Sequence, residues 1–376
     1  MQMKRLFIIV VAAMLGSCAV VGGDVVLKVS NPIDTARKGE IVEVKWRELR
    51  NAAVTPEQVV VYAEEGSQVP SQVIFDDMGK PISVIFQTDV PASGAAQYRV
   101  SREYPEEYES KVFGRYVPER MDDYAWENNL TTYRIYGPAL KDPQTQGVDV
   151  WVKSTSKLII NEWFARNDYH HNYGEGMDCY KVGNTLGGGA LAVVNDGKLV
   201  LSGNYTRQEC LANGPLRTEA EFDYAEVEVE GKKVAMQRRI SLDADSRFTV
   251  QEYVFSGFDG EIEVAAGIVM HDVKALQQGD NWVAITEPAS DSKDPERDGD
   301  ISLAVILQGG ERCTQIDSHA AVVRKVKAGD KVLMLSGSAW SHAGIESPEA
   351  WRAEVEHYAA RLANPLQVER LRRRDK

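Results

Sequence analysis

Short runs of alternating apolar and polar residues recur along most of this chain, and they constrain its fold more than any other feature. Between residues 25 and 101 the runs are separated by turn pairs such as Lys38-Gly39 and Glu65-Gly66. Short strands at this spacing are typical of a β-sandwich. The pattern predicts a small N-terminal β-sandwich over residues 24–102. The expected strands are 25–29, 41–46, 58–62, 72–75, 82–86 and 97–101.

A second β-rich part is predicted over residues 122–369, after a charged, tyrosine-rich linker at 103–121. Asn195-Asp196-Gly197 between two apolar runs predicts a hairpin. Further strands are expected at 234–240, 248–255, 262–269, 301–307, 321–326 and 331–335. The fold class is therefore mainly β, with two β domains in succession.

One helix is predicted near the C-terminus. Ser347 is a suitable N-cap, Pro348 suits the first helical position, and Asn364-Pro365 ends the pattern. Apolar residues recur at helical spacing between these signals, so the helix is expected to dock on a sheet. They are Trp351, Val355, Tyr358 and Leu362.

The N-terminus has the layout of a secretory signal. Lys4 and Arg5 precede an apolar run at residues 6–15 that is too short to span a bilayer. Leu15-Gly16-Ser17-Cys18 resembles the bacterial lipobox, in which the cysteine becomes the lipidated first residue. We therefore expect a lipoprotein signal peptide at 1–17 and an exported protein anchored through Cys18, on the periplasmic or outer-membrane face of the envelope. The alternative is an ordinary signal peptide with an incidental cysteine.

Net charge and cysteine spacing exclude several classes of partner and site. A formal charge of −13 argues against nucleic acid, which needs clustered Lys and Arg. The basic run at 370–376 is expected to be a solvated tail. Beyond Cys18, the cysteines are Cys179, Cys210 and Cys313. Their spacing indicates neither a disulfide framework nor a structural metal site.

Residues 161–189 form the segment most suggestive of a site. They include two histidines, four acids, five aromatic residues, Arg166 and Lys181, punctuated by glycines. Core packing explains such a mixture poorly, because a core requires apolar periodicity. Just before it, a strand at 131–136 would place Thr132, Arg134 and Tyr136 on one face. An arginine beside a tyrosine on a sheet face is a suitable floor for a ligand.

Several motifs together resemble the family catalogued as domain of unknown function 4861. The resemblance covers nearly all of the chain after the signal peptide, and it implies an exported protein of Bacteroidota-type bacteria that takes part in the use of acidic plant and algal polysaccharides. The C-terminal part also looks like the β-supersandwich of galactose mutarotases and of sheet domains in polysaccharide lyases, a likeness of architecture alone. The motifs are Asp123, Ala125-Trp126-Glu127-Asn128, Arg134, Tyr136-Gly137-Pro138-Ala139-Leu140, Asp168-Tyr169-His170, Gly174-Glu175-Gly176, Asp178, Tyr180-Lys181-Val182-Gly183, Thr185-Leu186-Gly187 and Trp340-Ser341.

A site for an acidic sugar needs aromatic platforms, hydrogen-bonding groups and a cation for the carboxylate. About half of the candidate aromatic residues are expected to be buried in the core, where Trp and Tyr often lie. The substrate-binding candidates are Trp126, Glu127, Asn128, Arg134, Trp163, Tyr180, Arg217 and Trp340.

Two kinds of reaction remain open at this stage. β-Elimination needs a base, an enolate stabiliser and an acid, roles that suit His170, Tyr169, Lys181 and Arg134. Hydrolysis or epimerisation would instead use carboxyl groups such as Glu127, Asp168, Glu175 and Asp178. The catalytic candidates are Asp168, Tyr169, His170, Glu175, Asp178 and Lys181.

No cofactor is expected and no metal site is predicted, although a divalent cation is left open. His170, His171, Glu175 and Asp178 are metal-ligand types, but adjacent histidines on a strand face opposite ways and no zinc motif is matched. The acidic loop at 291–300 lacks the spacing of an EF-hand, and solvation is expected there in preference to calcium.

These observations predict a carbohydrate-active enzyme, a lyase or a glycoside hydrolase, that acts on an acidic, uronate-containing oligosaccharide. The alternative is a non-catalytic glycan-binding lipoprotein of a polysaccharide-utilisation system. A third interpretation is a structural partner within an envelope complex. The expected partners are the oligosaccharide and, through the lipid anchor alone, the membrane.

Overall fold

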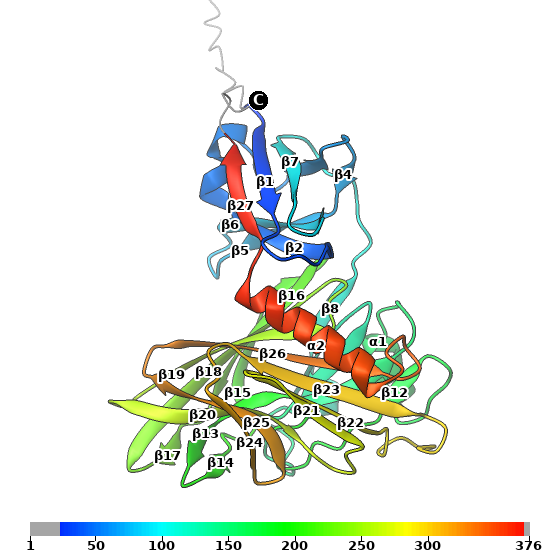
Figure 1. Ribbon diagram of the computed structural model, residues 1–376, viewed down its shortest axis with the longest axis vertical. Coiled ribbons are helices and arrows are strands. Elements are labelled where there is room, and N and C mark those ends of the chain that lie inside the picture. The colour runs from blue at the N-terminus through cyan, green and yellow to red at the C-terminus, as the bar shows by residue number, and fades with distance from the viewer. Residues whose placement is uncertain (1–22, 372–376) are drawn as a thin grey trace, which may run out of the picture.

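The structure is a computed structural model that describes residues 23–371. The predicted signal peptide, Cys18 and residues 372–376 of the predicted tail lie outside the described residues. A small β domain and a large β domain lie one above the other along the longest axis of the molecule (Figure 1). The large domain is the expected antiparallel β-supersandwich, so the predicted fold class is confirmed.

The N-terminal domain contains two sheets packed around one apolar core. Along the first strand Val25, Leu27 and Val29 point into this core, as alternation in a half-buried strand requires. The strands are β1 (Val25–Ser30), β2 (Arg37–Lys45), β3 (Val60–Ala63), β4 (Gln68–Val69), β5 (Ser71–Phe75), β6 (Pro81–Val90), β7 (Ala95–Ser101) and β27 (Gln367–Leu371), with the 3-10 helix η1 at Trp46–Ala52. The sheet orders are β27-β1-β7-β3-β4 and β2-β6-β5.

The position of strand β27 does not fit the predicted domain boundaries. It was expected partly in the second domain and partly in the solvated tail, yet it pairs with β1 through contacts such as Val26 with Leu371. Both ends of the described chain therefore lie in the small domain (Figure 1). Local alternation at residues 367–371 is too short to reveal a partner strand at the other end of the sequence.

The predicted linker at 103–121 contains strand β8 (Val112–Val117), the edge of a five-stranded sheet with the order β12-β11-β10-β9-β8. Only the part before β8 connects the domains. The other strands of this sheet are β9 (Asp123–Asn128), β10 (Thr131–Ile135), β11 (Asp149–Lys153) and β12 (Gly176–Asp178). The short helices beside it are η2 (Pro118–Arg120) and α1 (Ile160–Arg166).

Two further sheets complete the large domain. One has five strands in the order β14-β13-β20-β25-β24, and the other has nine, in the order β15-β16-β18-β19-β26-β23-β22-β21 with β17 paired to β18. The five strands are β13 (Ala190–Asn195), β14 (Lys198–Val200), β20 (Glu261–Val269), β24 (Arg312–Ile316) and β25 (His319–Lys327). The nine are β15 (Tyr205–Asn213), β16 (Arg217–Tyr224), β17 (Val227–Val229), β18 (Lys232–Asp243), β19 (Phe248–Ser256), β21 (Ala275–Gln278), β22 (Trp282–Pro288), β23 (Asp300–Leu307) and β26 (Lys331–Trp340).

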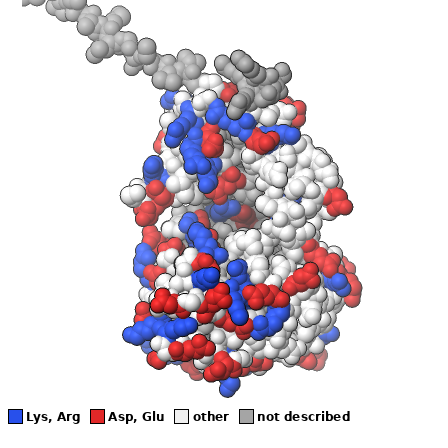
Figure 2. All heavy atoms as spheres, turned by 60° about the vertical axis from the view of Figure 1, so that its left-hand side comes forward, with Lys and Arg blue, Asp and Glu red and all other residues white. Residues whose placement is uncertain are grey.

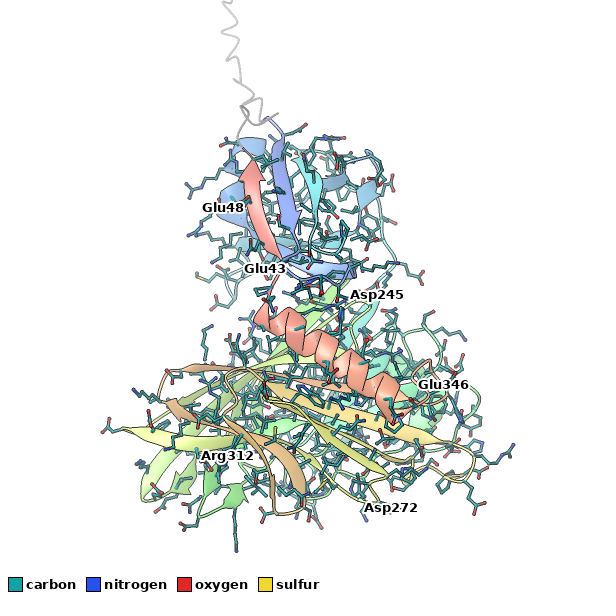
Figure 3. All side chains as sticks on the ribbon, viewed as in Figure 1. Glu43, Glu48, Asp245, Asp272, Arg312 and Glu346 are labelled. Carbon is teal, nitrogen blue, oxygen red and sulfur yellow. The ribbon has the colours of Figure 1, made fainter. Side chains whose placement is uncertain are left out.

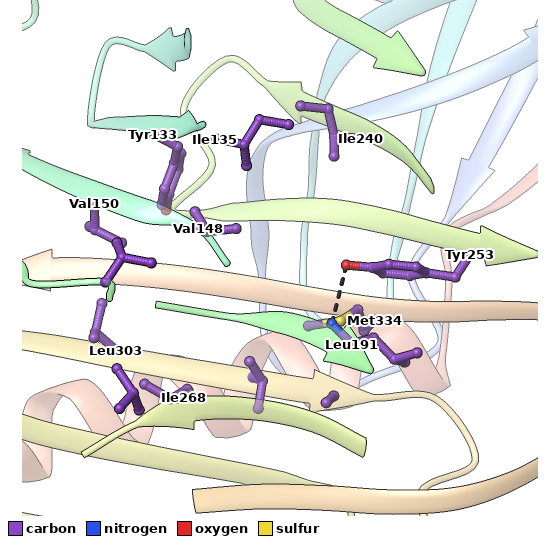
Figure 4. Packing of buried hydrophobic residues seen from close by; sticks show 14 of the residues in the cluster. Tyr133, Ile135, Val148, Val150, Leu191, Ile240, Tyr253, Ile268, Leu303 and Met334 are labelled. Carbon is purple, nitrogen blue, oxygen red and sulfur yellow. Dashed lines mark hydrogen bonds between the residues drawn. The ribbon is translucent and has the colours of Figure 1, made fainter. Parts of the chain in front are cut away.

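The part of the nine-stranded sheet that lies under helix α2 (Pro348–Ala363) is apolar on both faces. In β23, Leu303 and Val305 join the main core between the sheets, whereas Ala304 and Ile306 pack toward helix α2 on the other face. Figure 4 shows part of the main core, in which Tyr253 also accepts a hydrogen bond from the backbone N–H of Leu191 at 3.2 Å. Burial on both faces explains why residues 303–307 of β23 form an unbroken apolar run.

Helix α2 has the predicted bounds and docking face. The hydroxyl of Ser347 accepts a hydrogen bond from the Ala350 N–H at 3.2 Å, as an N-cap should. Trp351 and Val355 are fully buried against the nine-stranded sheet. The Asn195-Asp196-Gly197 hairpin is confirmed between β13 and β14.

Polar contacts join the two domains. In Figure 3, Glu43 of the small domain and Asp245 of the large domain lie near this junction, where Arg217 contacts Glu43 at 3.2 Å and Lys111 contacts Asp245 at 2.8 Å. A cavity of about 240 Å³ lies beside them, lined in part by Ile41 and Tyr358.

Charges of both signs are interspersed on the face drawn in Figure 2, with no large basic patch among the described residues there. Within residues 23–371, no helix is long and apolar enough to cross a membrane.

Candidate functional site

The outer face of the five-stranded β8–β12 sheet carries most of the buried charge of the large domain. Successive side chains of a strand point to opposite faces, so Trp126 and Tyr133 enter the main core while Glu127 and Arg134 point outward. Strand pairing then aligns Arg134 with Asp149 and Trp151 with Asp178. Helix α1 and the segment that follows it cover this face, so its charges are buried.

Arg134 is the centre of a cluster, the Arg134 cluster, formed with Asp123, Asp149 and Asp178. The Arg134 Nη2 atom lies 2.5 Å from an Asp149 oxygen and 3.1 Å from an Asp178 oxygen, and Nε lies 3.9 Å from Asp123. All four side chains are buried. The guanidinium is therefore already matched to protein carboxylates.

Aromatic rings enclose the same guanidinium. Its central carbon lies 5.1 Å from the ring centroid of Tyr136, 5.2 Å from that of Trp151 and 5.4 Å from that of Tyr169. These distances suit cation–π attraction. The rings exclude water from the ion pairs and strengthen them.

Three carboxyl groups face one guanidinium, so negative charge is in excess. Burial, followed by the neighbouring Asp149, raises the pKa of Asp178 well above its ordinary value, although Arg134 opposes the shift. Burial also raises the pKa of Asp123 to about 6. Both shifts oppose the ionisation of carboxyl groups that have too little positive charge around them.

The segment from Tyr169 to Asp178 folds back on itself beside the cluster. The Asp178 N–H donates to the Tyr169 carbonyl at 2.7 Å, and His170 Nδ1 lies 3.2 Å from the Asp178 carbonyl oxygen. His170 Nε2 lies 3.8 Å from Asp178 Oδ2. The imidazole is 41% exposed, whereas the Asp178 side chain is 1% exposed, so the pair extends from solvent to the buried cluster.

The Tyr169 ring stacks on Trp151 with centroids 4.9 Å apart. Its hydroxyl accepts hydrogen bonds from Arg120 Nε at 3.2 Å and from Arg134 Nη1 at 3.4 Å. The side chain is half-buried, and its position is fixed by these contacts.

The acidic loop after β22 packs against this segment. The Asp291 N–H donates to the Cys179 carbonyl at 3.3 Å, and the Lys293 N–H donates to the His170 carbonyl at 3.0 Å. Lys293 also pairs with Asp168, whose pKa it lowers by hydrogen bonding. Ligand atoms of His170, Asp178 and Asp291 all lie within 4.8 Å of one another.

A second histidine and carboxylate pair lies near Tyr180. His271 Nδ1 is 2.7 Å from an oxygen of the buried Glu287, and the His271 ring packs edge-on to Tyr180 at 5.2 Å. Hydrogen bonding to Glu287 raises the pKa of His271. Glu287 fixes Nδ1 as the protonated nitrogen, which leaves Nε2 as a proton acceptor in the neutral ring.

The structure brings four of the predicted site residues together: Arg134, Tyr169, His170 and Asp178. Asp168 lies at the edge of this group, where it pairs with the side chain of Lys293. The other two catalytic candidates lie apart from the cluster, because Glu175 pairs with Lys157 at 2.6 Å and Lys181 is exposed.

Most of the predicted substrate-binding residues have structural partners. Trp126 is buried and donates to Thr249, and Trp163 stacks on Trp151 with centroids 5.8 Å apart. Neither ring offers a free face to a sugar. Arg217 lies at the domain junction, where it is paired with Asp243 at 2.6 Å.

Polar members of that set also support the fold. Glu127 accepts hydrogen bonds from Lys153 at 2.8 Å and from the Ile160 N–H at 2.8 Å, which anchors the start of α1. Asn128 donates to two backbone carbonyls of the turn before β19.

Tyr180 and Trp340, the aromatic candidates from later in the chain, also have structural partners. Tyr180 donates to the Val269 carbonyl at 2.8 Å. Trp340 donates to the Asp298 carbonyl at 2.7 Å, and so holds the acidic loop from the far end of the chain.

Several residues of the site were missing from the sequence prediction. Asp149, Trp151 and Lys153 alternate along β11 with buried valines. This alternation places the two charged side chains on one face of the strand, and it could have been recognised in the sequence. Asp291 was predicted only as part of a solvated acidic loop, and His271 carried no local signal, because their positions beside the site depend on contacts between distant segments.

The chain matches a family model and resembles known proteins over most of its length. The family model described as "Domain of unknown function (DUF4861)" matches residues 29–368. A protein described as "Uncharacterized protein P7", from Formosa agariphila, is 27% identical over 399 residues, which cover 96% of this chain and 98% of the relative.

Two solved structures from Enterococcus faecalis share the fold. One is a protein in the glycosyl hydrolase family 38 (TM-score 0.53, 9% identity), and the other is an alpha-mannosidase (TM-score 0.55, 9% identity). Each match covers 93% of this chain, but only 48% and 46% of those chains, so this protein spans about half their length. The likeness is one of fold. The match over residues 29–368 shows that the chain belongs to the DUF4861 family, as its motifs predict.

Proposed function

We propose that this protein is an exported, lipid-anchored carbohydrate-active enzyme that cleaves or modifies an acidic, uronate-containing oligosaccharide where His170 and Tyr169 border the Arg134 cluster. The observation that carries the proposal is the pair formed by half-exposed His170 and buried Asp178, with Nε2 and Oδ2 3.8 Å apart. A base that solvent can reach, held beside a buried carboxyl group, suits proton abstraction from a bound substrate.

The surroundings of this pair support a sugar as substrate. Tyr169 provides an aromatic group next to His170, and apolar sugar faces pack well on such rings. The two solved structures of similar fold are described as a glycosyl hydrolase family 38 protein and an alpha-mannosidase, which is consistent with a carbohydrate substrate.

The recognition of a uronate cannot rest on Arg134. Its guanidinium is buried and already contacts three carboxylates, so binding a fourth would displace one of them. Arg120 and Lys293 are two further cations beside Tyr169 and His170, and Lys293 is itself paired with Asp168. Placing a substrate carboxylate near this acidic cluster requires additional positive charge.

β-Elimination is the reaction that the geometry favours. Hydrolysis by two carboxyl groups requires both to reach the scissile bond, but Asp123, Asp149 and Asp178 are buried under side chains. His170 and His271 are accessible bases by contrast. A histidine would take the proton from the carbon next to the uronate carboxyl group. The C–O bond to the leaving group would then break as the leaving oxygen takes the hydroxyl proton of Tyr169, whose oxygen accepts hydrogen bonds from Arg120 and Arg134.

The test is incubation of the chain from Gly22 onward with a panel of acidic oligosaccharides. New reducing ends together with the ultraviolet absorbance of unsaturated uronates are expected for the wild type, and His170→Ala should lower the rate at least about 100-fold, as the loss of a general base does. His171→Ala is the matched control, because His171 is exposed and contacts Tyr173. Reducing ends without absorbance would indicate hydrolysis. Saturable binding without turnover would favour the non-catalytic glycan-binding protein.

A further inference from the structure

We infer that His170, Asp178 and Asp291 bind a divalent transition-metal cation such as Zn²⁺ or Mn²⁺. One ligand atom from each residue lies within 4.8 Å of the other two. A cation bound at about 2.0–2.4 Å from each atom requires separations of about 3–4.8 Å between ligands, according to their angle. The three residues, named here the His170 group, therefore need only small side-chain shifts to coordinate one ion.

The hydrogen bonding of His170 prepares it as a ligand. Its Nδ1 lies 3.2 Å from the Asp178 carbonyl oxygen, which can only accept, so Nδ1 carries the proton. In the neutral ring Nε2 then has a lone pair, and this atom is 3.8 Å from Asp178 Oδ2, too far for a direct hydrogen bond. Metal-binding histidines commonly donate their other nitrogen to a carbonyl in this way.

Asp178 provides an independent indication of a missing positive partner. Its Oδ1 atom is buried and has no hydrogen-bond partner within the described residues, although the side chain is 1% exposed. An unsatisfied carboxylate oxygen is costly to bury. The single guanidinium of Arg134 already faces Asp123 and Asp149, so a divalent cation would supply charge that the cluster lacks.

Backbone contacts hold the three ligands in place. The Asp178 N–H binds the Tyr169 carbonyl at 2.7 Å, the Asp291 N–H binds the Cys179 carbonyl at 3.3 Å, and the Lys293 N–H binds the His170 carbonyl at 3.0 Å. Two segments more than 100 residues apart in sequence are thus fixed side by side. Such preorganisation lowers the cost of ordering the ligands when an ion binds.

The ligand types select the class of cation. An imidazole with two carboxylates suits Zn²⁺ or Mn²⁺, whereas Ca²⁺ and Mg²⁺ prefer oxygen ligands alone. Three protein ligands leave coordination positions open for a substrate oxygen. In the ion-bound protein His170 Nε2 would be occupied, so the accessible base would be His271. The ion would supply the positive charge that a uronate requires beside this cluster; this role rests on the proposed function, whereas the site itself does not.

Calorimetric titration of the EDTA-treated chain from Gly22 onward, with ZnCl₂ or MnCl₂ and no sugar, tests the inference. We expect one ion per chain and a higher melting temperature in its presence. Asp291→Asn removes an exposed ligand with little effect on folding and should weaken binding at least about 10-fold. His170→Ala should do the same.

Asp294→Asn and His171→Ala are the matched controls, because both residues are neighbours of a ligand and lie outside the His170 group. Equal affinity in Asp291→Asn and Asp294→Asn, a preference for Ca²⁺, or no binding by the wild type would overturn the inference. Because the titration contains no sugar, its failure would leave the proposed function standing. Conversely, ion binding without any turnover would count against the enzyme and not against the site.

Discussion

At Arg134 one buried guanidinium compensates three buried carboxyl groups, and this balance determines both the stability and the chemistry of the site. Alternation along residues 131–136 predicted that Arg134 and Tyr136 share a face, and their 5.1 Å contact confirms it. Asp149 could not be predicted as the partner, because strand register between distant segments is absent from local patterns. The residue types in the sequence thus showed which residues belong to the site, but not which of them contact one another.

Replacing Arg134 with methionine should lower the free energy of unfolding by about 3–5 kcal/mol, the usual cost of leaving buried charges without their partner. Guanidinium chloride denaturation at pH 7 measures the change. Arg166→Met is the control, since Arg166 forms an exposed pair with Glu162 and its loss should cost about 0.5 kcal/mol or less. Equal losses in the two variants would contradict the account of the Arg134 cluster.

Buried His319 makes the stability of the protein depend on pH. Burial lowers the pKa of His319 to about 4, and its Nε2 accepts a hydrogen bond from the Leu186 N–H at 3.0 Å. Between pH 4 and 6.5 the unfolded chain binds the extra proton, so the free energy of unfolding rises with pH across this window and falls on acidification. The total is on the order of 3 kcal/mol for a shift of this size. In His319→Gln the slope of unfolding free energy against pH should decrease over that window, and an unchanged slope would reject this assignment.

Elements with strong local signals were predictable from the sequence. Helix α2, with its Ser347 cap, and the hairpin at Asn195-Asp196-Gly197 match the prediction, since each depends on neighbours within a few residues. Several strands were not predicted, among them β9 and β11, which carry buried charges that break the expected apolar alternation. The others are β4, β8, β12, β15, β21, β22, β24 and β27. Short α1 was also unexpected, because its start is anchored by Glu127 from a distant strand.

Strand β27 is the element whose removal should be most revealing. Deleting residues 366–376 would strip one edge of the small domain and expose β1, so the amides of β1 that bond to β27 should exchange hydrogen much faster. Hydrogen exchange followed by mass spectrometry measures this. Deletion of residues 372–376 alone is the control and should leave exchange in β1 unchanged. If both deletions behave alike, β27 does not stabilise the small domain.

At the scale of the whole molecule, two β domains are joined by a chain that leaves the small one and returns to it. The order of two β domains followed from composition and turn spacing, whereas the return of the C-terminus did not. The same holds for the site, which is assembled from the outer face of one sheet and the acidic loop after β22. The domain junction has a cavity of its own and is a competing location for a ligand.

The most direct test is hydrogen exchange with and without the oligosaccharide of the panel that is turned over fastest. The account predicts that a saturating oligosaccharide slows exchange in residues 168–178 and 289–298, and that His170→Ala weakens this protection while His171→Ala preserves it. Protection confined to the junction near Ile41 and Tyr358, or no protection anywhere, would contradict it.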